Sequence, residues 1–292
     1  MRTHRGTVAT LSIVVAVASW AALLVATQSR DAMPLEPVAR SGESVTPAFE
    51  GWYPNPDGSF CLLLGYYNRN QTQVLDIPAG PNNRIEPGGP DQGQPTHFLT
   101  RRQWGVFTIT VPRDFGNKRL TWTIVANGRP MSVPVGIIPD YKVEPFEDAA
   151  TGNTPPVLRF EPGGPTHTGP PAGIAASLST TFPAPLALTV WATDKPPKKE
   201  VPPQPGVPPE PPLSLTLSQF RGPGAVSIKD PKPAIEKGDG KATTTVTFAE
   251  PGEYVLRVQA NDSSGDGGMG FQCCWTNALV KVSVKPSGSN RP

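Results

Sequence analysis

The chain has 292 residues, of which 38 are proline, 29 are glycine and 17% are charged, with a formal net charge of +2. Proline and glycine together approach the share at which a chain lacks folded structure. They cluster, however, between alternating apolar stretches, which favours an all-β protein with many turns. Because no stripe of lysine and arginine is present, nucleic acid is excluded as an expected partner.

The N-terminal segment, residues 1–29, predicts export. Arg2 and Arg5 precede an uncharged stretch that runs from Gly6 to Ser29. This order is typical of a secretory signal, and the stretch is also long enough for a membrane anchor, which takes about 20 apolar residues. Signal peptide and retained anchor both stay open. In either case we expect an extracytoplasmic body, secreted, periplasmic or anchored, that meets the membrane only through this segment.

Residues 30–44 are expected to form a polar linker, and residues 45–146 a first β-sandwich domain. Asn127-Gly128 is the strongest short hairpin signal and predicts a type I′ turn. Pro134, in the returning strand, predicts an edge strand or a bulge. The strands expected in this domain span residues 60–67, 73–77, 104–111, 120–126 and 131–138.

A second linker, residues 147–156, leads into a second domain over residues 157–286. Half of residues 195–212 are proline, so this insert is expected to be extended polyproline II. Residues 287–292 are a tail. Short, evenly spaced strands in both domains predict two tandem immunoglobulin-like β-sandwiches. The strands expected here span residues 156–162, 176–182, 186–194, 213–220, 225–228, 242–248, 253–260 and 278–284.

Residues 213–262 carry an ordered set of turn and strand residues. A strand leads into Gly222-Pro223-Gly224, and Pro251-Gly252 later precedes a strand that begins near Tyr254. This order resembles the immunoglobulin-like modules called PKD or REJ-like domains, over residues 157–285, although Leu217 stands where such modules often have tryptophan. The resemblance implies extracellular binding, adhesion or spacing, without catalysis. The first domain vaguely resembles uncharacterised secreted bacterial proteins.

The strand over residues 253–260 shows how these positions act. Pro251-Gly252 turns the chain into the strand, and Tyr254 occupies the place of a tyrosine corner, whose hydroxyl bonds to upstream backbone. Residues on one face are expected to point into the core, namely Tyr254, Leu256, Val258 and Ala260. Residues on the other face are expected to point outward, namely Val255, Arg257 and Gln259.

The stretch GDGGMGFQCCWTN, residues 265–277, contains a G-x-G-x-x-G match. Because it leads into a strand and not a helix, nucleotide binding is disfavoured. Just upstream, Asp262, Ser264 and Asp266 match the first half of a calcium-binding loop, but Cys273 stands where such a loop needs glutamate. Two alternatives stay open for this acidic half: a weak calcium site and a solvated loop. Apart from calcium in the first alternative, no cofactor is predicted.

Three cysteines, Cys61, Cys273 and Cys274, cannot all pair within one chain. Adjacent side chains of a regular strand point to opposite faces, so one of the two neighbouring thiols could meet Cys61 or the core. The alternatives are a structural disulfide or core thiol, a disulfide between the neighbours themselves, and a redox or metal-binding thiol site.

Trp52 and Tyr53 lie among asparagine, aspartate, proline and glycine residues that suggest a loop. Two rings on a loop suit stacking against a sugar, so they are candidate ligand-binding residues. The alternative is that the rings close one end of the first sandwich.

No catalytic motif is present in the sequence, and no catalytic residue is predicted. The sequence therefore predicts an exported, non-enzymatic binding, adhesion or scaffolding protein of the cell envelope whose partner is a protein or a glycan. One alternative is a calcium- or carbohydrate-binding accessory module. Another is a thiol redox protein that uses Cys273 and Cys274.

Overall fold

The computed structural model describes residues 39–195, 198, 213–262 and 273–288. In these residues the regular structure consists of β-strands and one short 3-10 helix, η1 (Pro139–Tyr141). The predicted fold class, all-β with two tandem immunoglobulin-like sandwiches, is confirmed for this part. The predicted N-terminal segment lies outside it. Within the described ranges, no helix has the length and hydropathy that a bilayer crossing requires.

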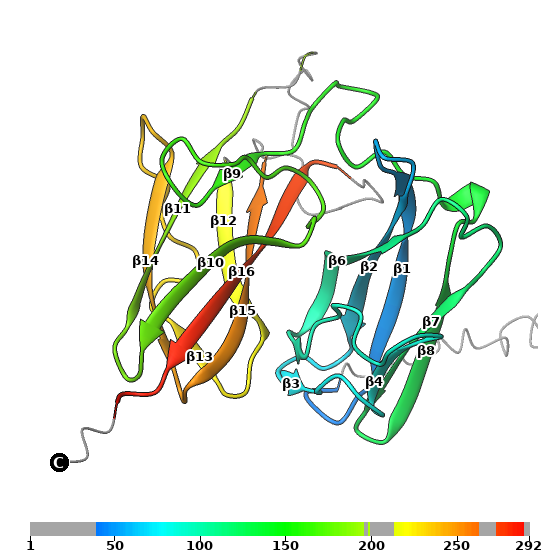
Figure 1. Cartoon of the computed structure of the whole chain (residues 1–292), viewed down its shortest axis with the longest axis horizontal. Coiled ribbons are helices and arrows are strands. Elements are labelled where there is room, and N and C mark those ends of the chain that lie inside the picture. Colours follow the sequence, from blue (N-terminus) through cyan, green and yellow to red (C-terminus); the bar gives the residue numbers. More distant parts are fainter. Residues whose placement is uncertain (1–38, 196–197, 199–212, 263–272, 289–292) are drawn as a thin grey trace, which may run out of the picture. The chain divides into compact units, whose positions relative to one another are not determined.

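The first sandwich pairs its described strands into sheets of order β1-β2-β6 and β4-β7-β8 and a ribbon β3-β5 (Figure 1). Asn127 and Gly128 join β7 to β8 with positive φ angles of 49° and 74°, as a type I′ turn requires. Pro134 lies in β8, at the edge of its sheet. The strands are β1 (Val45–Pro54), β2 (Phe60–Asn68), β3 (Leu75–Asp76), β4 (Asn83–Glu86), β5 (His97–Phe98), β6 (Arg101–Val111), β7 (Leu120–Ala126) and β8 (Arg129–Val135).

Strand β1 was not among the expected strands, because its residues break the period of two that marks a strand. Pro47 and Gly51 interrupt the pattern, and the pairing with β2 shifts register between Phe49 and Gly51. Such a bulge places an extra residue in one strand and changes which side chains face inward. The strand expected over residues 73–77 is shorter than expected, since only Leu75–Asp76 pairs regularly.

The core of the first sandwich is built around Trp122, which is fully buried in β7. Its ring meets Phe107 of β6 edge-on, with 5.0 Å between the ring centroids. Its indole N–H donates to Asn83 Oδ1 at 3.0 Å, and the Asn83 amide donates to the carbonyls of Ile77 and Pro95. The core therefore fixes both ends of the loop between residues 77 and 96, for which the sequence predicted no regular structure.

The second sandwich has sheets of order β10-β16-β15-β12 and β13-β14-β11-β9 among its described strands. Strand β10 runs parallel to β16, and the other pairs are antiparallel. This order is that of an immunoglobulin constant-type domain with an additional first-strand segment beside the last strand. The strands are β9 (Val157–Arg159), β10 (Ile174–Thr181), β11 (Leu186–Thr193), β12 (Ser214–Arg221), β13 (Val226–Ile228), β14 (Lys241–Phe248), β15 (Gly252–Asn261) and β16 (Trp275–Lys285).

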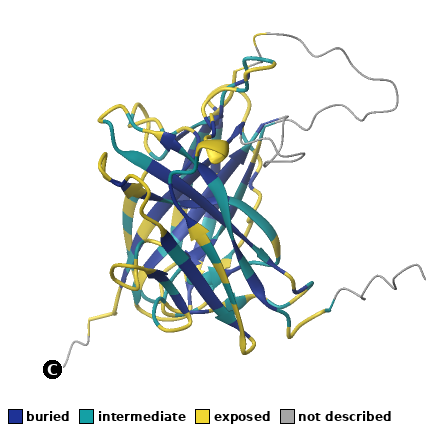
Figure 2. Ribbon diagram, turned by 90° about the vertical axis from the view of Figure 1, so that its right-hand side faces the viewer, coloured by how far each residue is buried: buried dark blue, intermediate teal, exposed yellow. Residues whose placement is uncertain are grey.

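Tyr254 lies near the start of β15, as the sequence predicted. Its hydroxyl donates to the backbone carbonyl of Glu250 at 2.9 Å, which is the bond of a tyrosine corner. A Cβ at Gly222 would overlap the Tyr254 ring, so glycine is required there. The alternate residues that follow Tyr254 in β15 are fully buried, and Figure 2 shows such buried residues along the strands and exposed ones in the loops.

Residues 39–292 form one unit that holds both sandwiches. The apolar core of the first sandwich also includes Phe220 of β12 and Leu279 of β16, and Val255 of β15 packs against it. In this sheet, the outer face of β12, β15 and β16 is therefore covered by the first sandwich.

Candidate functional site

The contact between the two sandwiches overturns the expectation that one face of β15 points outward. Arg257 and Gln259 are both buried, and Arg257 is only 4% exposed. The period of two was assigned correctly, but the opposite face of the strand meets the first sandwich instead of water. A sequence pattern gives the two faces of a strand without saying what covers the second one.

Arg257 is the centre of this contact. Its Nε donates to Asn277 Oδ1 at 2.9 Å, and its Nη2 donates to Gln259 Oε1 at 3.2 Å, both within the second sandwich. Across the contact, Nη1 donates to Gln103 Oε1 and Nη2 donates to the Trp104 carbonyl, each at 3.0 Å. A guanidinium offers five N–H donors in a fixed plane, and here that plane ties β15 to β6.

A buried carboxylate lies on the other side of the same contact. Glu50 of β1 pairs with Arg102 Nη2 at 2.7 Å, and its Oε2 accepts the Gly105 N–H at 2.6 Å. The Arg102 guanidinium lies 3.8 Å from the centroid of the Trp104 ring. Burial raises the pKa of Glu50 above its usual value, although Arg102 and the Gly105 N–H oppose the shift. The contact thus contains a buried carboxylate that is held within the first sandwich and a buried arginine, Arg257, that bonds to both sandwiches.

Gly105 allows the two sandwiches to approach closely. Its φ is +50°, and a Cβ there would overlap the ring of Trp275 at the start of β16. Asn277, two residues further along β16, donates from Nδ2 to the Gly105 carbonyl at 2.8 Å. We name the set Glu50, Arg102, Gly105, Arg257, Trp275 and Asn277 the seam. In the sequence, only Gly105 could have indicated the seam, because a glycine inside a strand often marks a place where another backbone approaches closely.

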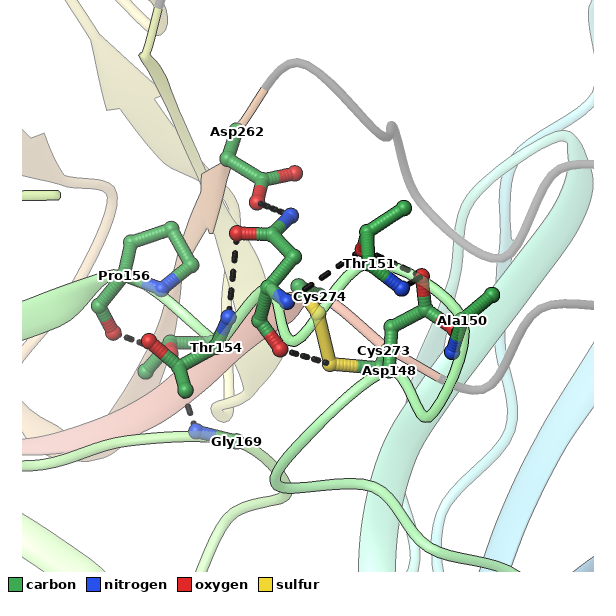
Figure 3. Close-up of a disulfide and its surroundings, with 11 residues drawn as sticks. Asp148, Ala150, Thr151, Thr154, Pro156, Gly169, Asp262, Cys273 and Cys274 are labelled. Atoms are coloured by element: carbon green, nitrogen blue, oxygen red, sulfur yellow. Dashed lines mark hydrogen bonds between the residues drawn. A yellow bond between two sulfur atoms is a disulfide. The ribbon is translucent and has the colours of Figure 1, made fainter. Parts of the chain in front are cut away.

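Cys273 and Cys274 are joined to each other by a disulfide immediately before β16 (Figure 3). Of the three alternatives drawn from the sequence, the structure therefore has the bond between neighbours. Cys61 is a free, buried thiol in a different cluster, with Tyr53 and Val143, so pairing with Cys61 is ruled out. Both bonded cysteines are buried.

The linker between the domains packs around this disulfide. Cys273 Sγ lies 3.9 Å from the Asn153 carbonyl oxygen, and the Asn153 amide donates to Asp262 at the end of β15 (Figure 3). Thr276 donates to the Pro156 carbonyl at 2.5 Å and accepts the N–H of Gly169 at 2.9 Å. These bonds fix the linker to the first residues of β16, so the disulfide and the seam adjoin the same strand end.

The calcium hypothesis concerns Asp262, Ser264 and Asp266. Asp262 is only 1% exposed and accepts a hydrogen bond from Asn153. Ser264 and Asp266 lie outside the described residues, so the loop hypothesis stays a prediction. Among the described residues, no group of three or more histidine, cysteine, aspartate or glutamate side chains gathers in a way that could hold a metal ion.

Trp52 and Tyr53 do not lie on a loop, and this expectation is corrected: both belong to strand β1. Tyr53 is 5% exposed and packs with Cys61 and Val143, and burial raises its pKa. Trp52 is partly buried against the core and donates from its indole to the Ile138 carbonyl at 2.6 Å. The two rings point to opposite sides of a strand and form no shared stacking surface.

Comparison with known proteins gives no family for this chain. No protein-family profile matches it, and no curated protein matches it either. Among solved structures, a tandem pair of titin immunoglobulin domains is 11% identical, covering 84% of this chain and 100% of that chain with a TM-score of 0.24. A domain of intimin is 11% identical, covering 82% of this chain and 99% of that chain with a TM-score of 0.26. Likenesses this low carry no argument about function.

Proposed function

We propose that the protein is an exported, non-enzymatic binding or scaffolding module of the cell envelope, in which two sandwiches act as one rigid body. The observation that carries the proposal is Arg257, a buried arginine whose guanidinium bonds to β6 of the first sandwich and to β16 of its own. Contacts between domains of one chain are commonly small and polar, so relative motion is the default. A buried guanidinium that bonds to both sandwiches favours rigidity at such a contact.

Export is supported by the N-terminal basic residues and the uncharged stretch after them. It is also supported by the Cys273–Cys274 disulfide, since disulfides persist mainly in oxidising compartments. The second sandwich, with its tyrosine corner at Tyr254, is proposed to be a PKD-like module.

Two experiments test the proposal. Alkaline phosphatase fused after Pro292 is expected to be active in cells, and an inactive fusion would contradict export. The purified full chain is then sedimented with envelope fragments, where saturable binding is expected. Prior protease treatment of the fragments abolishes binding to a protein partner and spares binding to a glycan. Absence of saturable binding to either preparation would contradict a binding role.

A thiol redox role is the second candidate, favoured by the bond between the sulfurs of Cys273 and Cys274. In this reaction a thiolate of an external dithiol attacks one sulfur and forms a mixed disulfide. The second thiol of the dithiol then attacks the dithiol's own sulfur in the mixed disulfide and releases the second cysteine thiol. The products are two cysteine thiols and the oxidised dithiol, with two electrons and two protons transferred to the protein. Because both sulfurs are buried, the test is whether a small dithiol reduces the bond faster than the native protein unfolds. Reduction only upon unfolding would assign the bond a purely structural role.

A further inference from the structure

Strand β10 (Ile174–Thr181) has a free outer edge. It is the first strand of its sheet and pairs only with β16. Among the described residues, no backbone hydrogen bond from another segment is made to residues 174–180 on the side away from β16. A row of unpaired N–H and C=O groups on an edge strand is a template for pairing with another chain.

Natural proteins protect exposed edges with proline, charge, bulges, short strands or covering loops. Strand β10 has one of these devices, a bulge between Ile174 and Ala176 at its start, and residues 176–181 after it pair with β16 in regular register. Its sequence, IAASLSTT, contains no proline and no charged residue over eight positions. Ser177 and Ser179 are exposed on its outer face, and Ile174 is 49% exposed.

The other edge strands among the described residues are protected. Pro130 and Pro134 lie in β8, and β1 has a bulge and is covered by Val143, whose N–H donates to the Trp52 carbonyl. In β12, the Phe220 carbonyl accepts the N–H of Thr96, and the Leu217 N–H donates to the carbonyl of Pro231. Strand β6 meets Arg257 and Asn277, and β4 is covered by the amides of Gln92 and Gln94. The remaining edge strands are short: β9 and β13 have three residues each, and β3 and β5 have two each.

A hollow of about 260 Å³ opens beside the free edge, between the two sheets of the second sandwich. Phe160 and His167 line one side of it, and residues 175–178 of β10 line the other. The side chains of Ala176 and Leu178 lie on the inner face, since they pair with Val280 and Val282 of the core. The edge thus offers both backbone hydrogen bonds and space for an apolar side chain.

We infer that β10 is a docking edge for β10 of a second copy of this chain, in antiparallel pairing. The two-fold axis of such a pair is perpendicular to the sheet, so inner-face side chains of one copy stay on the inner face of the joined sheet. Ala176 and Leu178 of each copy then cover the hollow of the other copy. Because β10 is uncharged, no like charges are opposed. Since the other described edges are protected, this pairing closes as a dimer and does not continue as a fibre.

Sedimentation of the purified full chain in detergent tests this inference. A reversible dimer is expected to form at protein concentrations up to roughly 100 µM. Such weak association is typical of interfaces that bury less than about 1,200 Å². The double variant Ser177→Lys/Ser179→Lys adds edge charges and is expected to weaken dimerisation at least tenfold. Ser227→Lys, an exposed position on the edge strand of the other sheet, is the matched control and is expected to leave it unchanged. Thermal melting of each variant verifies that it is folded.

Position-specific cross-linking gives a second readout. Ser177→Cys, treated with a short bis-maleimide, is expected to give a covalent dimer, whereas Ser227→Cys gives none. A chain that stays monomeric over the whole range overturns the inference, even if another protein binds the edge. A dimer whose dissociation constant is the same in the lysine variant also overturns it.

Discussion

Replacement of Arg257 by methionine tests whether the seam holds the sandwiches together. Methionine keeps the length of the buried stem and removes the guanidinium. Four acceptors then lose a charged donor, namely Gln103 Oε1, the Trp104 carbonyl, Gln259 Oε1 and Asn277 Oδ1. Glu50 also loses a nearby positive charge. Because these acceptors can partly find other donors, we expect the free energy of unfolding to fall by about 3–5 kcal/mol, the loss typical of removing one partner of a buried ionic network.

Urea unfolding measures this loss, and hydrogen exchange locates it. The Gly105 amide, which donates to Glu50, is expected to exchange faster in Arg257→Met, while the amide of Trp122 in the core changes less. Arg129→Met is the matched control. Arg129 pairs with Glu43 at the surface, where an ion pair contributes at most about 1 kcal/mol. A loss in Arg257→Met no larger than in the control would refute the argument that the seam is held by this side chain.

Three further predictions concern single positions. Gly105→Ala is expected to destabilise the protein by about 1–3 kcal/mol in urea unfolding, because its Cβ overlaps the Trp275 ring; an unchanged midpoint would contradict the close approach. Tyr254→Phe is expected to cost about 1 kcal/mol by the same measurement, through loss of the bond to Glu250, and a neutral result would mean that the corner has no energetic role. Partial desolvation, with a contribution from Asp262, raises the pKa of Asp194 from 3.8 to about 6. The folded state therefore binds this proton more tightly, and stability falls as pH rises between these values. The difference in stability between wild type and Asp194→Asn, measured at pH 3.5 and pH 7, is expected to show this fall, and a constant difference would contradict it.

The strands of the second sandwich could be predicted because their side chains alternate regularly. In β15 the inner residues Tyr254 to Ala260 are all buried, as the pattern required. The same pattern could not show that Arg257 is buried, because that depends on a contact with Gln103 of β6, which lies 154 residues earlier in the chain. Alternation reports two faces, and only tertiary structure decides what each face meets.

Strand β1 and the state of the cysteines were beyond sequence reasoning for a different reason. A bulge at Gly51 breaks the alternation that would have marked β1, so Trp52 and Tyr53 resembled loop residues. The pairing of Cys273 with Cys274 could only be given as one of several alternatives, since three cysteines allow several partners. In both cases local backbone geometry, and not residue type, decides the outcome.

The seam also determines how the protein responds to a pulling force. Tension applied between residue 39 and residue 288 passes from one sandwich to the other through the linker of residues 147–156 and, in parallel, through Arg257. While the seam is intact it shields the linker from load, and the pair extends as a single body. Rupture of the seam would release only the linker, whose ten residues span at most roughly 35 Å when fully extended, before either sandwich loses a strand.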